Sequence, residues 1–243
     1  MTAATLGERG GARRSAPRAI VDHCVLAANA RALVGASAAP VAADLRRDAW
    51  GHGLIEVWRT LRASGIDAFV VDDDARAALG IAGADAGTLR RRGDTAEAPA
   101  AADLYGLPGG AGTPVLRLHG SVLSVKPLRV GEGVSYGYLH RAAVDTRIAL
   151  VAGGYAQGVV RSLGGAVGVR IGGERRPIVG RIAMDVCVVD LGETAAARGD
   201  EVVFFGDQGA GHPPLADWTE ATGLTAAEIV TTVGLRAQRE HVS

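Results

Sequence analysis

The chain has 243 residues, a length that can bury the core of one or two domains. Its 26 basic and 26 acidic side chains balance, so it lacks the charge excess that attracts nucleic acids or anionic membranes, and we expect neither as a partner. No stretch approaches the roughly 20 apolar residues of a membrane-spanning helix, which favours a soluble protein.

The amino-terminal part is predicted to be a tail followed by α/β units. Residues 1–18 mix arginine, glycine, serine and alanine without the apolar run of a signal peptide, and we expect a disordered tail there. Buried strands and amphipathic helices then alternate: a helix at 19–34, a strand at 41–45, a helix at 54–64, a strand at 66–71 and a short helix at 75–79. This order is typical of parallel βα units, so residues 19–80 are predicted to form a small α/β part.

The pattern changes twice in the rest of the chain. Residues 81–113 are rich in alanine, glycine, arginine and proline without periodicity, which is typical of a linker. Short alternating runs separated by glycines then predict strands at 115–125, 146–152, 167–171, 177–179, 184–189 and 201–205, followed by helical spacing at 215–223 and 226–235. We therefore predict an α+β chain in which residues 114–243 form a mainly β domain.

The cysteines indicate the compartment. Cys24 and Cys187 lie far apart and match no metal-ligand spacing. Two reduced thiols in a cytoplasmic protein, without a structural disulfide or a metal site, are the expectation.

Four glycine-containing motifs in the β domain occur in a fixed order. They are G-V-S-Y-G at 133–137, G-Y-A-Q-G at 154–158, P-I-V-G-R-I-A-M-D at 177–185 and G-D-E-V-V-F-F-G at 199–206. In this order and at these spacings the set resembles the carboxy-terminal domain of alanine racemases, and Glu228 and Arg236 near the end of the chain also match.

The front part resembles the same family. R-R-D-A-W-G-H-G at 46–53 is similar to the family signature K-A-D-A-Y-G-H-G, and L-Y-G-L at 104–107 resembles the end of the family's barrel. Only about two βα units lie between the opening helix and that barrel end, whereas a closed barrel has eight strands and about 250 residues. The resemblance thus implies a truncated TIM-barrel-like part followed by an alanine-racemase-type β domain.

The resemblance also implies a cofactor, pyridoxal phosphate (PLP), held in the family as a Schiff base on a lysine. That lysine position is Arg46 here, and a guanidinium with a pKa above about 12 neither deprotonates nor forms the Schiff base. The family's phosphate-binding tyrosine is Trp50, which has no hydroxyl, and the arginine near the pyridine nitrogen corresponds to Pro99. The single lysine, Lys126, lies in the β domain, where we expect a solvated charge at a strand end. PLP binding by this chain is therefore doubtful.

Other family positions are retained. Tyr136 stands at the position of the catalytic tyrosine, which in the family accepts or donates the substrate proton in the neighbouring subunit's site. Met184 stands where the family places a backbone donor to the substrate carboxylate, and Asp185 follows it in the same M-D pair. Gln157 replaces an aspartate of the family pattern. His52, between two glycines, is expected to be a turn residue rather than a general base.

Several hypotheses of function follow. We favour a pseudoenzyme in which the racemase β domain serves as a binding or assembly module. The alternatives are an active PLP-dependent alanine racemase that interconverts L- and D-alanine for cell-wall synthesis, a chain that completes a full-length racemase by pairing with it, and a decaying remnant. The resemblance implies a homodimer or such a heterodimer, and a small-molecule ligand is possible. Because two strands would leave an uncovered face, we expect the front part to pack on the β domain, pack on a second copy, or stay loose.

Overall fold

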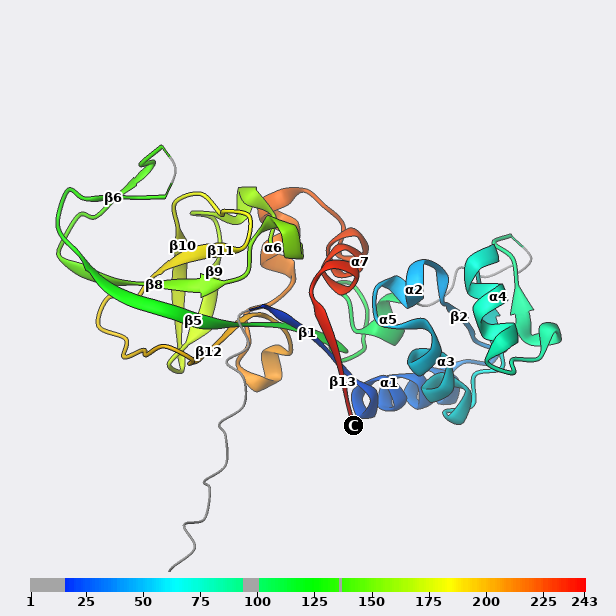
Figure 1. Cartoon of the computed structure of the whole chain (residues 1–243). Helices are drawn as coiled ribbons and strands as arrows, with labels where there is room; N and C mark the ends of the chain where they lie inside the picture. The colour runs from blue at the N-terminus through cyan, green and yellow to red at the C-terminus, as the bar shows by residue number, and fades with distance from the viewer. Residues whose placement is uncertain (1–15, 94–100, 136) are drawn as a thin grey trace, which may run out of the picture.

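The computed structural model describes residues 16–93, 101–135 and 137–243. Tyr136 and Pro99, two positions singled out from the sequence, lie outside the described residues. Figure 1 shows a mainly β part and a smaller α/β part side by side, with strands β1 and β13 and helix α7 between them.

The β part is a closed antiparallel barrel. Its strands run in the order β12-β9-β10-β11-β8-β5, and a further pairing of β12 with β5 closes the ring. They are β5 (Leu116–Leu128), β8 (Thr146–Ala152), β9 (Gly168–Ile171), β10 (Glu174–Val179), β11 (Val186–Asp190) and β12 (Glu201–Phe205). All six predicted strands are confirmed, and β8 and β12 have the predicted bounds, because short apolar runs bounded by polar residues and glycines are typical of buried strands.

Two strands extend this sheet toward the α/β part. β1 (Arg18–Asp22) pairs antiparallel with β5 and parallel with β13 (Gln238–Val242). The predicted helix at 19–34 is therefore wrong at its start: Asp22 caps α1 (His23–Ala36) by accepting from the backbone amides of Cys24 and Val25. The predicted tail over 1–18 also ends too late, since Arg18 belongs to β1; residues 1–15 lie outside the described part.

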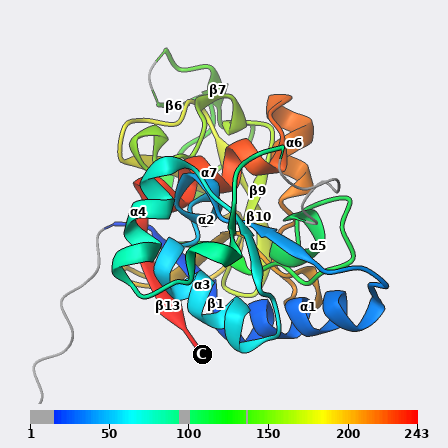
Figure 2. The same cartoon turned by 90° about the vertical axis from the view of Figure 1, so that its right-hand side faces the viewer.

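The α/β part is built on a three-stranded parallel sheet, β2-β3-β4. Its strands are β2 (Ala42–Asp44), β3 (Ala68–Val70) and β4 (Leu89–Arg90), and its helices are α3 (Leu54–Ala63) and α4 (Asp73–Ile81), with α5 (Ala101–Tyr105) packed against α1. Figure 2 shows α1, α3 and α4 together at the end of the molecule away from the barrel. Because β4, α5 and the 3-10 turn Ala86–Thr88 lie within 81–113, that stretch is not the structureless linker predicted.

The α/β part packs on the β domain within this chain, because residues 46–50 contact the helix at 226–236 and α1 contacts β13. Ala43 and Phe69 of the small sheet are each 1% exposed and belong to the same core cluster as Val151 and Phe204 of the barrel. One of the three expected arrangements is thus found, and one hydrophobic core serves both parts.

The remaining elements connect these units. They are α2 (Arg46–Trp50), β6 (Gly133–Val134), β7 (His140–Arg141), α6 (Ala216–Thr222), α7 (Ala226–Arg236) and the 3-10 turns Tyr155–Gln157, Arg161–Leu163 and Gln208–Ala210. Helix α7 starts at a capping box between Thr225 and Glu228, as its sequence pattern T-x-x-E suggests. Together these elements form the predicted α+β fold, a truncated barrel followed by a β domain. No helix in the described residues is long and apolar enough to cross a membrane.

Candidate functional site

A left-handed turn follows strand β2. Arg47, Asp48, Ala49 and Trp50 have φ values of 55°, 58°, 52° and 55°, although none of them is glycine. Each such residue costs about 1–2 kcal/mol, so the turn must be held by its surroundings. The Asp48 carboxylate stabilises the turn through two hydrogen bonds. Its Oδ1 accepts from the amide of Leu54 at 2.7 Å, and its Oδ2 accepts from the guanidinium of Arg239, on β13, at 2.6 Å.

Arg46, at the family's lysine position, is committed to an ion pair. Its backbone amide and its Nε donate to Asp44 Oδ1 at 3.0 and 2.9 Å, and its Nη2 donates to Asp44 Oδ2. The Asp44 side chain is 2% exposed and that of Arg46 is 28% exposed, so a buried carboxylate binds a partly exposed cation. The hydrogen bond that Arg46 donates to Asp44 raises the pKa of Arg46 above its ordinary value, against the effect of burial. Arg46 is therefore fixed in the protonated form.

Three aromatic rings stack beside this pair. The ring of Tyr105 lies 5.9 Å from that of Trp50 and 4.5 Å from that of His52, and its hydroxyl donates to the backbone carbonyl of Asp44 at 2.9 Å. Burial raises the pKa of Tyr105 well above its ordinary value and lowers that of His52 to about 4. His52 Nδ1 lies 3.0 Å from the carbonyl oxygens of Ala49 and Trp50, which agrees with its expected role as a turn residue.

A cleft opens above the turn. It has a volume of about 690 Å³ and is lined by Arg46, Arg47 and Trp50 on one side and by the α7 residues Glu228, Thr231 and Thr232 on the other. Asp72 also lines the cleft, and its carboxylate accepts a hydrogen bond from the backbone amide of Arg47 at 3.0 Å. The cleft contains guanidinium, indole, hydroxyl and carboxylate groups and no amine.

A second hollow, also of about 690 Å³, lies under the β6–β7 arm of the barrel. Lys126 and Ser124 of β5 line it together with Ser135 and Gly137, the neighbours of Tyr136. Lys126 is exposed, as expected for a charge near the end of a strand. The two hollows share no lining residue, so within one chain Lys126 lies apart from Arg46.

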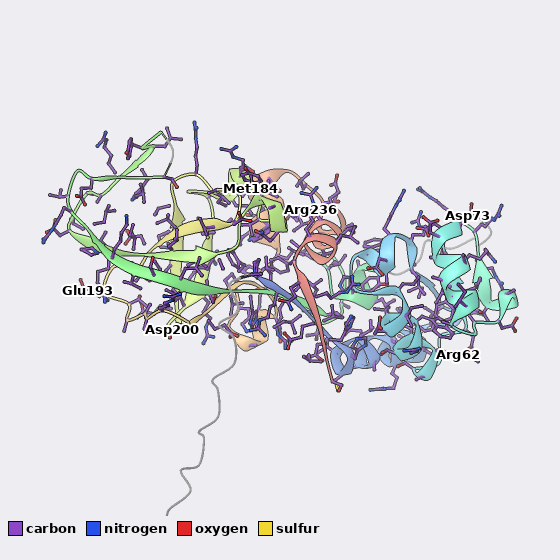
Figure 3. All side chains as sticks on the ribbon, viewed as in Figure 1. Arg62, Asp73, Met184, Glu193, Asp200 and Arg236 are labelled. Carbon is purple, nitrogen blue, oxygen red and sulfur yellow. The ribbon has the colours of Figure 1, made fainter. Side chains whose placement is uncertain are left out.

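Met184 and Asp185 lie on the loop before β11. Met184 is 55% exposed, and Figure 3 shows it on the β part of the molecule, at a distance from Arg62 and Asp73 at the other end. Gln157 accounts for its departure from the family's aspartate: its Oε1 accepts from the amide of Gly154 at 3.0 Å and its Nε2 donates to Asp185 at 2.8 Å. A carboxylate at 157 has no proton with which to bind Asp185.

The groups that sequence reasoning missed are those that hold the turn. Asp44 lies in the strand predicted at 41–45 and is the last residue of β2, and its position two residues before Arg46 was a signal for a local pair. Arg239 contacts Asp48 across 191 residues of chain, and no local pattern indicates that contact. Among the described residues, no group of three or more histidines, cysteines, aspartates or glutamates is placed to hold a metal ion.

A parallel α/β unit joined to a closed antiparallel barrel, with an arginine-bearing turn at the carboxyl end of the first parallel strand, defines a protein built on the fold of amino-acid racemases. A family model described as "Alanine racemase, C-terminal domain" matches residues 115–241, more than half of the chain. The chain belongs to the alanine racemase family.

Curated relatives match over the β domain. The alanine racemase of Mycobacterium leprae is 46% identical over 130 residues, which are 53% of this chain and 34% of that protein. The alanine racemase of Streptomyces coelicolor is 42% identical over 130 residues, 54% of this chain and 33% of that protein. The chain thus matches about a third of the length of these curated relatives.

Solved structures match over both parts. Alanine racemase from Streptomyces lavendulae superposes with a TM-score of 0.79 at 23% identity, covering 95% of this chain and 98% of that one. The enzyme from E. faecalis has a TM-score of 0.81 at 19% identity, covering 96% and 99%. The Bartonella henselae enzyme, solved with covalently bound pyridoxal phosphate, has a TM-score of 0.76 at 17% identity, covering 93% and 99%. At these identities the likeness shows the fold.

Proposed function

We propose that this chain is an alanine-racemase-like pseudoenzyme that does not racemise alanine by itself. The observation that carries the proposal is Arg46, which stands where the family has its Schiff-base lysine and is bound through its side chain to the buried carboxylate of Asp44. Condensation with an aldehyde needs a neutral amine with a free electron pair. A guanidinium held protonated by a buried carboxylate offers neither.

The other residues of the cleft do not fit pyridoxal phosphate either. Trp50 replaces a hydroxyl with an indole N–H, and its ring is stacked on Tyr105 rather than free to receive a ligand. The parallel sheet has the three strands β2, β3 and β4 in the described residues, whereas a complete barrel encloses its cofactor with eight. We therefore derive no catalytic step through this cofactor.

An isotope-exchange experiment tests the proposal. The protein is incubated with pyridoxal phosphate and L-alanine in deuterated water. We expect the NMR signal of the alanine α-proton to decay at the same rate as with free cofactor alone. The variant Arg46→Lys/Trp50→Tyr reinstates the two family side chains, and Arg47→Lys places an amine one residue away as the matched control. Exchange above the free-cofactor rate by the unmodified chain contradicts the proposal.

One observation favours a second function, pairing with another racemase chain. Five of the eight large apolar side chains that are exposed in the described part of the chain gather on the β6–β7 arm and the loop before β11. They are Val130, Tyr138, Leu139, Val144 and Met184, each 55–68% exposed. Exposed apolar side chains that gather on one part of a molecule favour an interaction site there. The arm also carries the position of the family's catalytic tyrosine, Tyr136, and Met184 stands at a family substrate position. The partner in this interpretation is a second copy or a full-length racemase in the cytoplasm.

The pairing is tested by complementation. A full-length alanine racemase whose own catalytic tyrosine is changed to phenylalanine is mixed with this chain, and racemisation is measured. Recovery of activity supports pairing if the Tyr136→Phe variant of this chain gives none. A mixture that forms no complex and recovers no activity removes the second function.

A further inference from the structure

Two histidines far apart in sequence meet between the first helix and the last strand. His23 opens α1 and His241 lies in β13, 218 residues later, yet His23 Nε2 is 2.8 Å from His241 Nδ1. Their ring centroids are 5.0 Å apart. His23 Nδ1 is in turn 2.6 Å from the hydroxyl oxygen of Thr60 on α3. The pair therefore ties β13 to two helices of the α/β part.

The hydrogen-bond chain assigns the protons. The Thr60 hydroxyl donates to the backbone carbonyl of Glu56 at 3.0 Å, so its oxygen accepts from His23 Nδ1–H. A neutral imidazole carries one N–H, which leaves His23 Nε2 as the acceptor for His241 Nδ1–H. A proton added to His241 Nε2 keeps that bond. When both rings are protonated, His23 Nε2 and His241 Nδ1 each carry an N–H, no acceptor remains between them, and the two N–H groups face each other.

We propose that His23 and His241 form an acid-sensitive latch that fastens β13 to α1 and α3 and opens when both rings are protonated. The latch rests on the contact geometry of the two rings and does not depend on the function proposed above.

The surrounding charges act on the two rings from every packed element. Burial lowers the pKa of His23 and His241 lowers it further, while Glu56 on α3 and Asp22 on β1 raise it. Asp22 is itself paired with Arg117 of β5 at 3.2 Å. Burial also lowers the pKa of His241. Arg239 lowers it further, while Glu56 and Asp48 raise it. Because both pKa values are depressed, the stabilisation is present above the ordinary value of 6.5 and is lost as the pH falls below it.

Strand β13 connects the histidine pair to the candidate site. His241 and Arg239 are two residues apart on one strand and therefore share a face. A Cβ built on Gly53 would lie 2.7 Å from His241 Cε1 and 3.2 Å from Arg239 Nε, so both side chains pack on the loop that follows the left-handed turn. Arg239 also binds Asp48 and the carbonyl of Gly51. Release of β13 removes the guanidinium that holds the turn beside Arg46.

Imidazole NMR on the unmodified protein tests the proton assignment, and hydrogen exchange tests the consequence. We expect His23 as the Nδ1–H tautomer at neutral pH, with His241 taking its proton first. Exchange protection in β13, corrected for intrinsic rates, should fall between about pH 7.5 and about pH 5, because the pKa values of both rings are lowered in the folded chain and the released form binds protons more readily. His23 found as the Nε2–H tautomer, or β13 protection that does not change with pH, overturns the latch.

Asparagine variants separate the two rings. His241→Asn presents an amide that can donate to neutral His23 or accept from protonated His23, so β13 should stay protected at both pH values. His23→Asn keeps the donor to Thr60 but removes the titrating acceptor, so β13 should exchange fast at both pH values. His140→Asn, the same change on β7, is the matched control and should behave as the unmodified chain. A His23→Asn variant that retains the full pH dependence contradicts the proposal; if it does not fold, the tautomer measurement decides.

Discussion

The substitution Gly234→Ala tests the contact between the two parts of the molecule. Gly234 lies inside α7, and a Cβ built there would stand 2.1 Å from the carbonyl oxygen of Gly51 and 2.6 Å from its carbonyl carbon, which belong to the turn beside the candidate site. Both atoms are backbone and cannot rotate away. In an exposed helix interior the same change stabilises by about 1 kcal/mol through helix propensity.

The steric overlap with Gly51 should make Gly234→Ala destabilising instead. Overpacking a tight contact costs about 3 kcal/mol when backbone must shift, so the net loss is about 2 kcal/mol after the propensity gain. Urea unfolding measures it as a lower midpoint at unchanged slope. Gly80→Ala in α4 is the matched control, because its Cβ meets nothing within 4 Å. A Gly234→Ala variant as stable as the Gly80→Ala variant would refute the close packing of α7 on the turn.

Three further predictions concern single side chains. Burial lowers the pKa of His52 to about 4, so the free energy of unfolding should contain roughly 3 kcal/mol above pH 6.5 that is lost as the pH falls toward 4. In a His52→Phe variant that still folds, the free energy of unfolding should depend less steeply on pH across that range. Cys24 is exposed whereas burial raises the pKa of Cys187 to about 12, so one thiol per chain should react with a thiol reagent under native conditions and two after unfolding. Tyr105→Phe leaves the buried carbonyl of Asp44 without its hydroxyl donor and should cost about 1 kcal/mol in the free energy of unfolding; an unchanged midpoint would contradict that bond.

The sequence predicted well those elements whose residue pattern lies within a single short stretch of the chain. Strands β8 and β12 are short apolar runs, I-A-L-V-A and V-V-F-F, each preceded by polar residues, and α7 begins at a capping box formed by Thr225 and Glu228. Strand β13 reads Q-R-E-H-V and has no apolar alternation; it is a strand because β1, over 200 residues earlier, lies parallel to it. Its existence depends on a contact that no window of sequence contains.

The candidate site also contains features that the local sequence predicts and features that depend on distant contacts. The loss of the family's amine is visible at Arg46 in the sequence itself. The left-handed turn was not predictable, because Arg47 to Trp50 have side chains that disfavour that conformation, and only tertiary contacts such as Arg239 with Asp48 maintain it. The pairing of Arg46 with Asp44 depends likewise on the direction in which that turn points the side chain.

The central claim, that Arg46 removes Schiff-base chemistry from this cleft, is tested most directly by borohydride trapping. The unmodified chain and Arg46→Lys are incubated with pyridoxal phosphate, reduced, digested and mapped for pyridoxyl-modified peptides. The account predicts no specific adduct in the peptide that contains residues 42–53 of the unmodified chain, and an adduct there only after an amine is installed at position 46. A stoichiometric adduct at Lys126 in the unmodified chain would contradict the account, because it would show that the cofactor site has moved to the barrel.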